Sequence, residues 1–274
     1  MNPPSATPSV RRSRLPVGLA PLTLHRPGDP FALIDAAARA GFAAVGMTPR
    51  TPDGAWASWC RQPTLTAVAS AAANSGLAVT DVGVATLDTP QDTDAVHRLT
   101  EVAAALGAGV LIVLDRDHDA RRAHDSLAAI TESAARSGVT AGLEFMAYSA
   151  APDVSKARRL TAGTAAGIVF DVFQHERAGG SPADLDEDDP LVLVQLADGV
   201  PMSDVDLRTE ALTDRRLPGH GTFDLPAYLA RVPAGVPITV EAPCLALAQL
   251  PWHEQARAAA QATSELLDRL LPEA

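Results

Sequence analysis

Short β-branched runs alternate with amphipathic helical stretches along almost the whole chain. The β-branched runs predict strands, and apolar residues repeating every three to four positions predict helices. The eight strand-like runs are LPVGLAP (Leu15–Pro21), AAVGMT (Ala43–Thr48), AVTDVGVA (Ala78–Ala85), GVLIVLD (Gly109–Asp115), VTAGLEF (Val139–Phe145), GIVFDVF (Gly167–Phe173), LVLVQLAD (Leu191–Asp198) and PITVEAP (Pro237–Pro243). Helical stretches such as PFALIDAAARAGF follow these runs, and several end at a glycine that suits a left-handed cap.

Eight β-then-α units in about 250 residues predict a (β/α)8 TIM barrel, that is, a single α/β domain. We expect this domain to span residues 15–274, because no long polar linker divides them. A doubly wound open sheet is the competing architecture, but no GxGxxG motif follows the first strand-like run. The chain of 274 residues, 47% of them hydrophobic, can bury one core of the required size.

Residues 1–14, MNPPSATPSVRRSR, are rich in proline, serine and arginine, so we expect them to form a disordered tail. The pair Arg11-Arg12 resembles a twin-arginine export signal, but Pro16 and Pro21 interrupt the following apolar stretch and no A-x-A cleavage site is present. No run approaches the roughly 18 apolar residues that span a bilayer, so a membrane partner is not expected.

Charge and cysteine content narrow the partners and the compartment. With 22 Lys+Arg against 33 Asp+Glu, the formal charge is -11, which argues against binding to a nucleic acid backbone. The single lysine, Lys156, lies in a polar helical stretch, so a Schiff-base mechanism has no good candidate. Cys60 and Cys244 form no CxxC motif and are too few for a disulfide framework, which fits a reducing cytoplasm.

Polar residues end four consecutive strands: Glu144, Asp171, Gln195 and Glu241. In a TIM barrel the active site lies at the carboxyl ends of the strands. Side chains alternate along a strand, so these polar residues point inward while the apolar residue before each of them packs outward on the helices. Three converging carboxylates require a cation among them. All-oxygen ligation suits Mn²⁺ or Mg²⁺, so we predict a divalent metal site; four separate strand-end caps are the alternative.

The motifs GLEF, FDVFQHERAGG, VQLADG, DRRLPGHG and ITVEAP occur in this order. Through them the chain resembles the xylose isomerase-like TIM-barrel superfamily, the sugar phosphate isomerase/epimerase group that also includes inosose and 3-dehydroshikimate dehydratases. The resemblance implies that Glu144, Asp171, Gln195 and Glu241 hold one divalent metal. It also implies that Glu144 and Glu241 serve as the acid/base pair on opposite faces of the substrate.

The sequence departs from the family pattern after the sixth strand. Family members commonly have D-x-x-H there, with the histidine on a substrate oxygen, whereas this chain has Gln174 at that position and His175 one step later. Either Gln174 binds the substrate as a neutral donor, or the strand continues and alternation puts Asp171 and His175 on one face. His175 is then a candidate catalytic residue, because an imidazole can carry a proton and an amide cannot.

Other residues are candidates for substrate binding. Arg177 and one of Arg215 or Arg216 are the cations best placed to anchor a hydroxyl-rich or anionic substrate, although each is equally suited to a structural ion pair with Asp198 or the acidic run ADLDEDD. By resemblance, the loop RRLPGHG with His220 folds over the substrate. The loop after the second strand carries Trp56 and Trp59, which suit either a stacking platform or packing on the barrel rim.

Together with these residues, the resemblance implies a metal-dependent isomerase or epimerase that acts on a small polyhydroxy carbonyl compound through an enediolate, because this chemistry is the broadest in the family. A dehydratase of the inosose or 3-dehydroshikimate type is the alternative, because the same constellation serves either reaction. The substitution at Gln174 keeps open a catalytically silent binding module. Helix faces outside a barrel often carry dimer contacts, so a homodimer is a further expectation.

Overall fold

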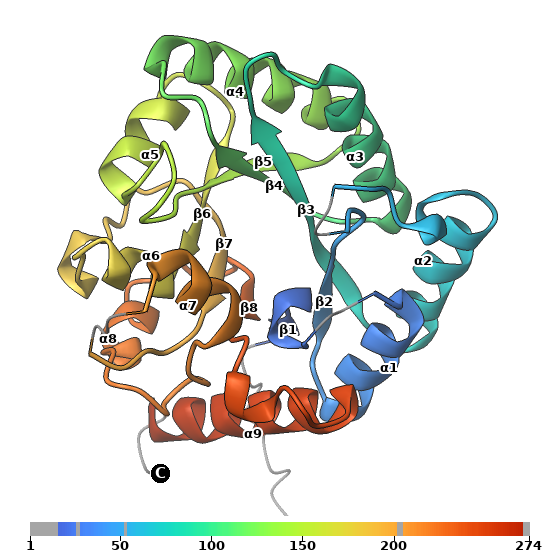
Figure 1. Cartoon of the computed structure of the whole chain (residues 1–274), viewed down its shortest axis with the longest axis vertical. Coiled ribbons are helices and arrows are strands. Elements are labelled where there is room, and N and C mark those ends of the chain that lie inside the picture. Colours follow the sequence, from blue (N-terminus) through green and yellow to red (C-terminus); the bar gives the residue numbers. More distant parts are fainter. Residues whose placement is uncertain (1–15, 26–27, 52–53, 202–204, 271–274) are drawn as a thin grey trace, which may run out of the picture.

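The computed structural model describes residues 16–25, 28–51, 54–201 and 205–270. Eight parallel strands pair in chain order, and β8 pairs with β1 to close a barrel (Figure 1). The strands are β1 (Val17–Leu19), β2 (Ala44–Met47), β3 (Ala78–Leu87), β4 (Val110–Asp115), β5 (Thr140–Glu144), β6 (Gly167–Asp171), β7 (Leu191–Leu196) and β8 (Ile238–Val240). The predicted single-domain (β/α)8 barrel is confirmed.

Helices surround the barrel and connect its strands. In the described residues they are α1 (Pro30–Ala40), α2 (Thr64–Asn74), α3 (Thr93–Leu106), α4 (Ala120–Ala135), α5 (Val154–Thr161), α6 (Val172–Arg177), α7 (Leu207–Thr213), α8 (Leu225–Leu229) and α9 (Trp252–Leu270), with 3-10 turns η1 (Pro21–Thr23), η2 (Ser58–Cys60), η3 (Pro182–Asp184) and η4 (Leu245–Leu247). The last helix, α9, packs on α1 and completes the ring (Figure 1). None of the described helices is long and apolar enough to span a bilayer.

Aspartates set where most of these helices begin. Seven helices start after an aspartate whose carboxylate accepts a hydrogen bond from a backbone N–H of the first turn: Asp29, Asp92, Asp119, Asp153, Asp171, Asp206 and Asp224. Such caps satisfy N–H groups that have no partner inside the helix. Part of the strongly acidic composition therefore serves the strand-to-helix junctions rather than a ligand.

The strands separate two apolar regions, as the alternation of side chains predicts. Inside the barrel, Val110, Ile112, Val169 and Leu193 form a small core. The residues that precede the four polar strand ends belong to the large core between strands and helices: Leu143, Phe170, Val194 and Val240. The polar residues that follow them are therefore turned toward the barrel interior.

Two sequence expectations about boundaries need comment. The strand over residues 167–173 was predicted too long: β6 ends at Asp171, whose Oδ1 accepts the N–H of Phe173 at 2.8 Å, so the chain turns into α6 at once. The option that this strand continues to His175 is therefore wrong. The predicted tail, residues 1–14, lies outside the described residues.

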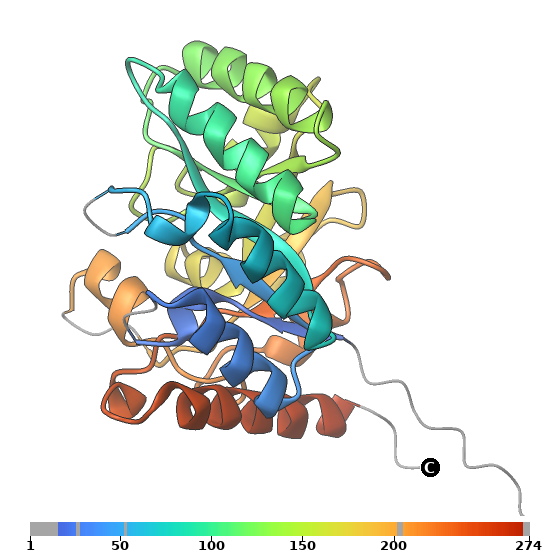
Figure 2. The same cartoon turned by 90° about the vertical axis from the view of Figure 1, so that its right-hand side faces the viewer.

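The carboxyl ends of the strands open on one face of the molecule. In Figure 2 this face lies on the left, where α7 (orange) and the loop after β2 (light blue) are found. The beginning of β1 and the end of α9 lie toward the opposite face. Loops of the left-hand face are the ones that can supply residues to a site at the barrel mouth.

Candidate active site at the carboxyl end of the barrel

Three carboxylates meet at the carboxyl end of the barrel. Glu144 is the last residue of β5, Asp171 is the last residue of β6, and Glu241 directly follows β8. One oxygen from each lies within 4.8 Å of the others. Glu144 and Asp171 are buried, and the Glu241 side chain is only 13% exposed. The structure thus brings together three of the four residues in the predicted metal site.

The fourth predicted ligand, Gln195 on β7, lies in register with Asp171 on β6. Its side chain is buried, and its Oε1 has no hydrogen-bond partner. Burying an amide oxygen without a hydrogen-bond donor costs free energy, and a bound cation would remove this cost. Together with the three carboxylates, this amide oxygen would complete a donor set that fits a hard divalent cation.

Arg215 places a cation beside these carboxylates. Its guanidinium is buried and Nη1 donates to Asp171 Oδ2 at 2.8 Å and to the Glu241 carbonyl oxygen at 3.0 Å. The same nitrogen lies 3.4 Å from Glu241 Oε2. The side chain is held by a bond from Nε to the Ala211 carbonyl oxygen at 2.7 Å and by stacking on Phe173. Of the predicted substrate-binding arginines, Arg215 is the one that reaches the carboxylates.

Burial and mutual repulsion change the acidity of these groups. Burial raises the pKa of Glu144 well above its usual range, the charges of Glu241 and Asp171 raise it further, and Arg215 lowers it. Burial also raises the pKa of Glu241, opposed by Arg215 and reinforced by Asp171. Carboxyl groups with raised pKa values can exchange protons near neutral pH, which suits general acid and base chemistry.

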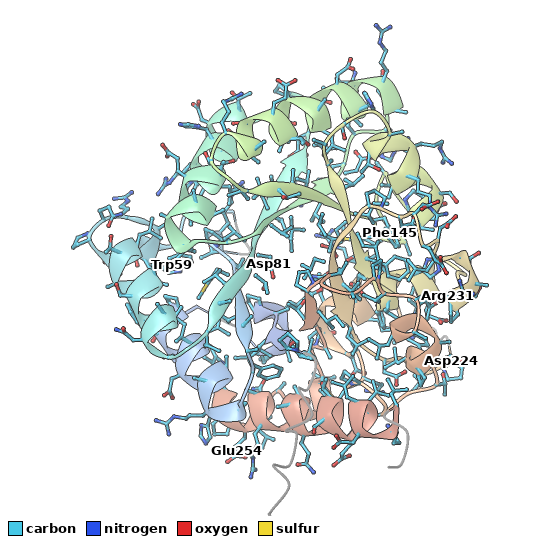
Figure 3. The ribbon with its side chains drawn as sticks, turned by 180° about the vertical axis from the view of Figure 1, so that it is seen from behind. Trp59, Asp81, Phe145, Asp224, Arg231 and Glu254 are labelled. Carbon is cyan, nitrogen blue, oxygen red and sulfur yellow. The ribbon has the colours of Figure 1, made fainter. Side chains whose placement is uncertain are left out.

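Asp81 on β3 is a fourth carboxyl group inside the barrel (Figure 3). It lies against Gly46 on β2, where a Cβ atom would come within 2.7 Å of Asp81 Oδ2. Burial raises the pKa of Asp81 to about 6, although Thr80 donates a hydrogen bond to it at 2.7 Å. Its charge in turn raises the pKa values of Glu144 and Glu241. Sequence reasoning missed Asp81, because it stands in the middle of a strand-like run rather than at its end.

Gln174 lies at the edge of the carboxylate cluster, beside a tyrosine that the sequence did not indicate. Its Oε1 accepts the N–H of Ala147 at 3.3 Å, and its Nε2 lies 3.5 Å from the hydroxyl of Tyr148, at the limit of a hydrogen bond. Burial raises the pKa of Tyr148 to about 12, with Arg215 lowering it and Glu144 raising it. Gln174 and Tyr148 are therefore neutral polar groups at this site.

His175 does not join the carboxylates. Because α6 begins directly after Asp171, its ring turns into the layer between strands and helices, where it contacts Phe145, Phe170 and Tyr228. Its Nε2 lies 3.0 Å from the Ser181 carbonyl oxygen. The expectation of a catalytic His175 rested on a continuing strand, so its physical basis is lost.

The other predicted substrate-binding cations have partners of their own. Arg177 forms a buried ion pair with Glu210, with Nε donating at 2.8 Å, and it stacks on Phe173. Arg216 pairs with Asp214 at 2.8 Å. His220 is exposed in the turn after Leu217. For Arg177 and Arg216 the structural interpretation therefore describes the contacts observed.

The two tryptophans of the loop after β2 differ in their surroundings. Trp59, in η2, is buried in the large core, and the predicted alternative of packing on the barrel rim describes it. Trp56 is half-buried, with the guanidinium of Arg98 from α3 4.0 Å from its ring centre and that of Arg50 at 5.7 Å. Cation–π contacts of this kind hold the loop against α3.

A (β/α)8 barrel with acidic side chains at the carboxyl ends of β5, β6 and β8 defines the class of protein. The model of the xylose isomerase-like TIM barrel family matches residues 34–266, so the chain belongs to this family. No curated protein matches the sequence.

Solved structures share this fold at low sequence identity. The IolI protein with a bound zinc atom is 15% identical and superposes with a TM-score of 0.80 over 94% of this chain and 100% of that chain. The probable 3-DHS dehydratase AsbF of petrobactin synthesis from Bacillus anthracis is 11% identical, with a TM-score of 0.74 over 91% and 99%. A D-tagatose 3-epimerase-like protein is 14% identical, with a TM-score of 0.70 over 93% and 98%.

A longer protein also contains this fold. The chain covers 43% of a fusion of a xylose isomerase-like TIM barrel with a 4-hydroxyphenylpyruvate dioxygenase, and 94% of this chain takes part in the match. The two are 21% identical, with a TM-score of 0.79. All these likenesses concern the fold, and the chemistry has to be argued from the residues of the site.

Proposed function

We propose that this chain is a divalent-metal-dependent isomerase or epimerase of a small polyhydroxy carbonyl compound. The observation that carries the proposal is the convergence of Glu144, Asp171 and Glu241 within 4.8 Å at the carboxyl end of the barrel. Gln195 Oε1, which has no hydrogen-bond partner, supports an all-oxygen donor set. Such a set favours Mn²⁺ or Mg²⁺ as the ion.

The proposed chemistry uses two carboxyl groups as acid and base. Glu144 reaches the site from β5 and Glu241 from the end of β8, so the two can address a substrate from different sides. One carboxylate removes a proton from a carbon next to a carbonyl group, and the other carboxyl group returns a proton to the opposite face. When bound, a divalent ion supplies electrostatic stabilisation of the negative charge that develops on substrate oxygens.

Neutral and cationic neighbours would bind the substrate. Arg215 has donors next to Asp171 and Glu241, and a planar guanidinium suits a carbonyl or hydroxyl oxygen. Gln174 and Tyr148 offer an amide and a hydroxyl as further groups for a substrate. This environment favours an unphosphorylated substrate, because among the described residues Arg215 is the one arginine that pairs with these carboxylates.

A metal-dependent dehydratase is the second candidate, and the similarity to AsbF favours it. The same first step, removal of a proton next to a carbonyl group, is then followed by departure of a β-hydroxyl group. The carboxyl group that returns a proton to carbon in an isomerase would here give its proton to the leaving oxygen. The two reactions therefore differ only in the second proton transfer.

The composition supports our proposals about the cell compartment and about nucleic acid as a partner. Free thiols at Cys60 and Cys244 suit a reducing cytoplasm. The formal charge of -11 argues against nucleic acid as a partner. A homodimer through the outer faces of the helices is also part of the proposal.

Incubation in deuterated water with ketoses, inososes and 3-dehydroshikimate, each with added Mn²⁺, tests the proposal. An isomerase or epimerase puts solvent deuterium into an isomeric product, whereas a dehydratase gives a product that has lost one water. Glu241→Gln should abolish either reaction, and Glu254→Gln, at a half-buried position of α9 away from the barrel interior (Figure 3), should not. Equal turnover by the wild type and Glu241→Gln would contradict the assigned roles.

A further inference from the structure

Asp198 is a buried carboxylate that accepts hydrogen bonds from backbone N–H groups. It follows β7 by two residues and is 1% exposed. Its Oδ1 accepts the N–H groups of Gly199 at 2.8 Å and Phe223 at 3.0 Å, and its Oδ2 accepts those of Gly219 at 3.0 Å and Gly221 at 2.9 Å. In the described chain no arginine, lysine or histidine side chain pairs with it. The sequence left open an ion pair between Asp198 and an arginine, and in its place the structure has four hydrogen bonds from backbone N–H groups.

These bonds shape the loop of residues 215–223, which we call the arginine loop. A Cβ atom on Gly221 would lie 2.2 Å from Asp198 Oδ1, so the close approach of this backbone requires glycine. The backbones of Asp198 and Arg216 also pair in both directions, at 2.9 Å and 2.8 Å. Asp198 therefore ties the arginine loop to the end of β7 through main chain and side chain together.

The arginine loop carries the cation that reaches the candidate metal site. Arg215 directly precedes the residue paired with Asp198, and its own N–H donates to the Pro243 carbonyl oxygen at 2.7 Å. From this position Nη1 reaches Asp171 Oδ2 at 2.8 Å and Glu241 Oε2 at 3.4 Å. A fixed positive charge at this distance from the ligands repels a divalent ion. Binding of an ion between the same carboxylates must therefore displace Arg215 or work against its charge.

We propose that Asp198 is a positioning residue which, by anchoring the arginine loop, keeps Arg215 among the carboxylates and so limits their affinity for a divalent cation. The inference rests on the proposed function, in that the carboxylates bind a metal. It adds that Asp198, which is not a proposed ligand, controls the affinity of the ligands for the ion. If Asp198 holds the arginine loop less firmly, Arg215 can move away from the carboxylates at a lower cost in free energy.

The dissociation constant of Mn²⁺, measured by titration calorimetry on metal-free protein, tests this. Arg215→Gln should bind Mn²⁺ at least about tenfold more tightly than the wild type, because a nearby positive charge is gone. Asp198→Asn keeps the shape of the side chain but turns an NH₂ group toward amide donors, and it should also tighten binding. The double variant should bind no more tightly than Arg215→Gln alone, since Asp198 acts through Arg215.

A matched control separates positioning from general destabilisation. Asp189 is also a buried aspartate, but it pairs with Arg158 at 2.6 Å, away from the arginine loop. Asp189→Asn should lower the stability of the fold and leave the Mn²⁺ affinity unchanged. Wild-type affinity in Asp198→Asn, or effects of Asp198→Asn and Arg215→Gln that add in the double variant, would overturn the inference.

Failure of the proposed function gives a different result. If the wild type binds no Mn²⁺, the proposed metal site is wrong, and so is the inferred effect of Asp198 on metal affinity. The unfolding free energies of the four metal-free proteins then decide whether Asp198 positions Arg215. Positioning predicts that Arg215→Gln costs less stability in the Asp198→Asn background than in the wild type, and equal costs refute it.

Discussion

Asp81→Asn replaces a buried carboxyl group of the barrel interior by an amide of nearly the same shape. The hydrogen bond from Thr80 Oγ1 can persist, because the asparagine keeps a carbonyl oxygen. What changes is the charge. In the wild type, burial raises the pKa of Asp81 from 3.8 to about 6, so the folded protein binds a proton more tightly than the unfolded chain does.

The sign of the effect on stability follows from this difference. Between the unfolded and folded pKa values the native state holds more protons, so stability falls as the pH rises through that window. A pKa shift of about two units corresponds to about 3 kcal/mol of unfolding free energy. The wild type loses this stability as the pH rises to about 6, and regains it as the pH falls toward about 4. Asp81→Asn carries no such penalty, so it should be more stable than the wild type at neutral pH.

Urea unfolding of both proteins in the presence of a chelator, from about pH 4 to about pH 8, measures this difference. The gain in unfolding free energy of Asp81→Asn over the wild type should grow with pH and level off above about pH 6, at a value up to about 3 kcal/mol. Thr80→Val is a control, because it removes the hydrogen bond and keeps the charge. A difference that stays constant across this range would refute the assignment of the buried charge to Asp81.

Three further predictions concern the same framework. Gly46→Ala puts a methyl group within 2.7 Å of Asp81 Oδ2 and should lower the unfolding free energy by about 1–3 kcal/mol in urea titrations; wild-type stability would contradict the close contact. Arg177→Met leaves Glu210 buried without its partner and should cost about 3–5 kcal/mol, most of which Glu210→Leu should restore; no recovery in the double variant would speak against the ion pair. Gln195→Leu should unfold no more easily than the wild type without metal, since Oε1 has no partner to lose, yet its Mn²⁺ affinity should fall about tenfold or more in calorimetric titrations.

The barrel and the three carboxylates were accessible from sequence because both depend on local patterns. Alternation along a strand fixes which side faces inward, so Phe170 and Asp171 had to point in opposite directions. The position of a strand end is harder to predict. β6 stops at Asp171 because its carboxylate caps α6, and that single hydrogen-bonding choice turns His175 away from the site.

Contacts between distant segments explain the remaining differences. The sequence argument required a cation among the carboxylates, but it could not tell that Arg215 contributes one, because this depends on how Asp198 folds the arginine loop. Asp81 escaped notice for a similar reason. Its burial depends on the missing side chain of Gly46 on the neighbouring strand, and such a pairing has no signature in either segment alone.

Metal content after dialysis tests the central claim most directly. Elemental analysis of the wild type, Asp171→Asn and Glu254→Gln, each loaded with Mn²⁺ and then dialysed, compares a proposed ligand with a half-buried glutamate of α9 that is not part of the carboxylate cluster. We expect about one Mn²⁺ per chain in the wild type and in Glu254→Gln, and far less in Asp171→Asn. Absence of bound Mn²⁺ from the wild type, or equal retention by Asp171→Asn, would contradict the metal-dependent mechanism.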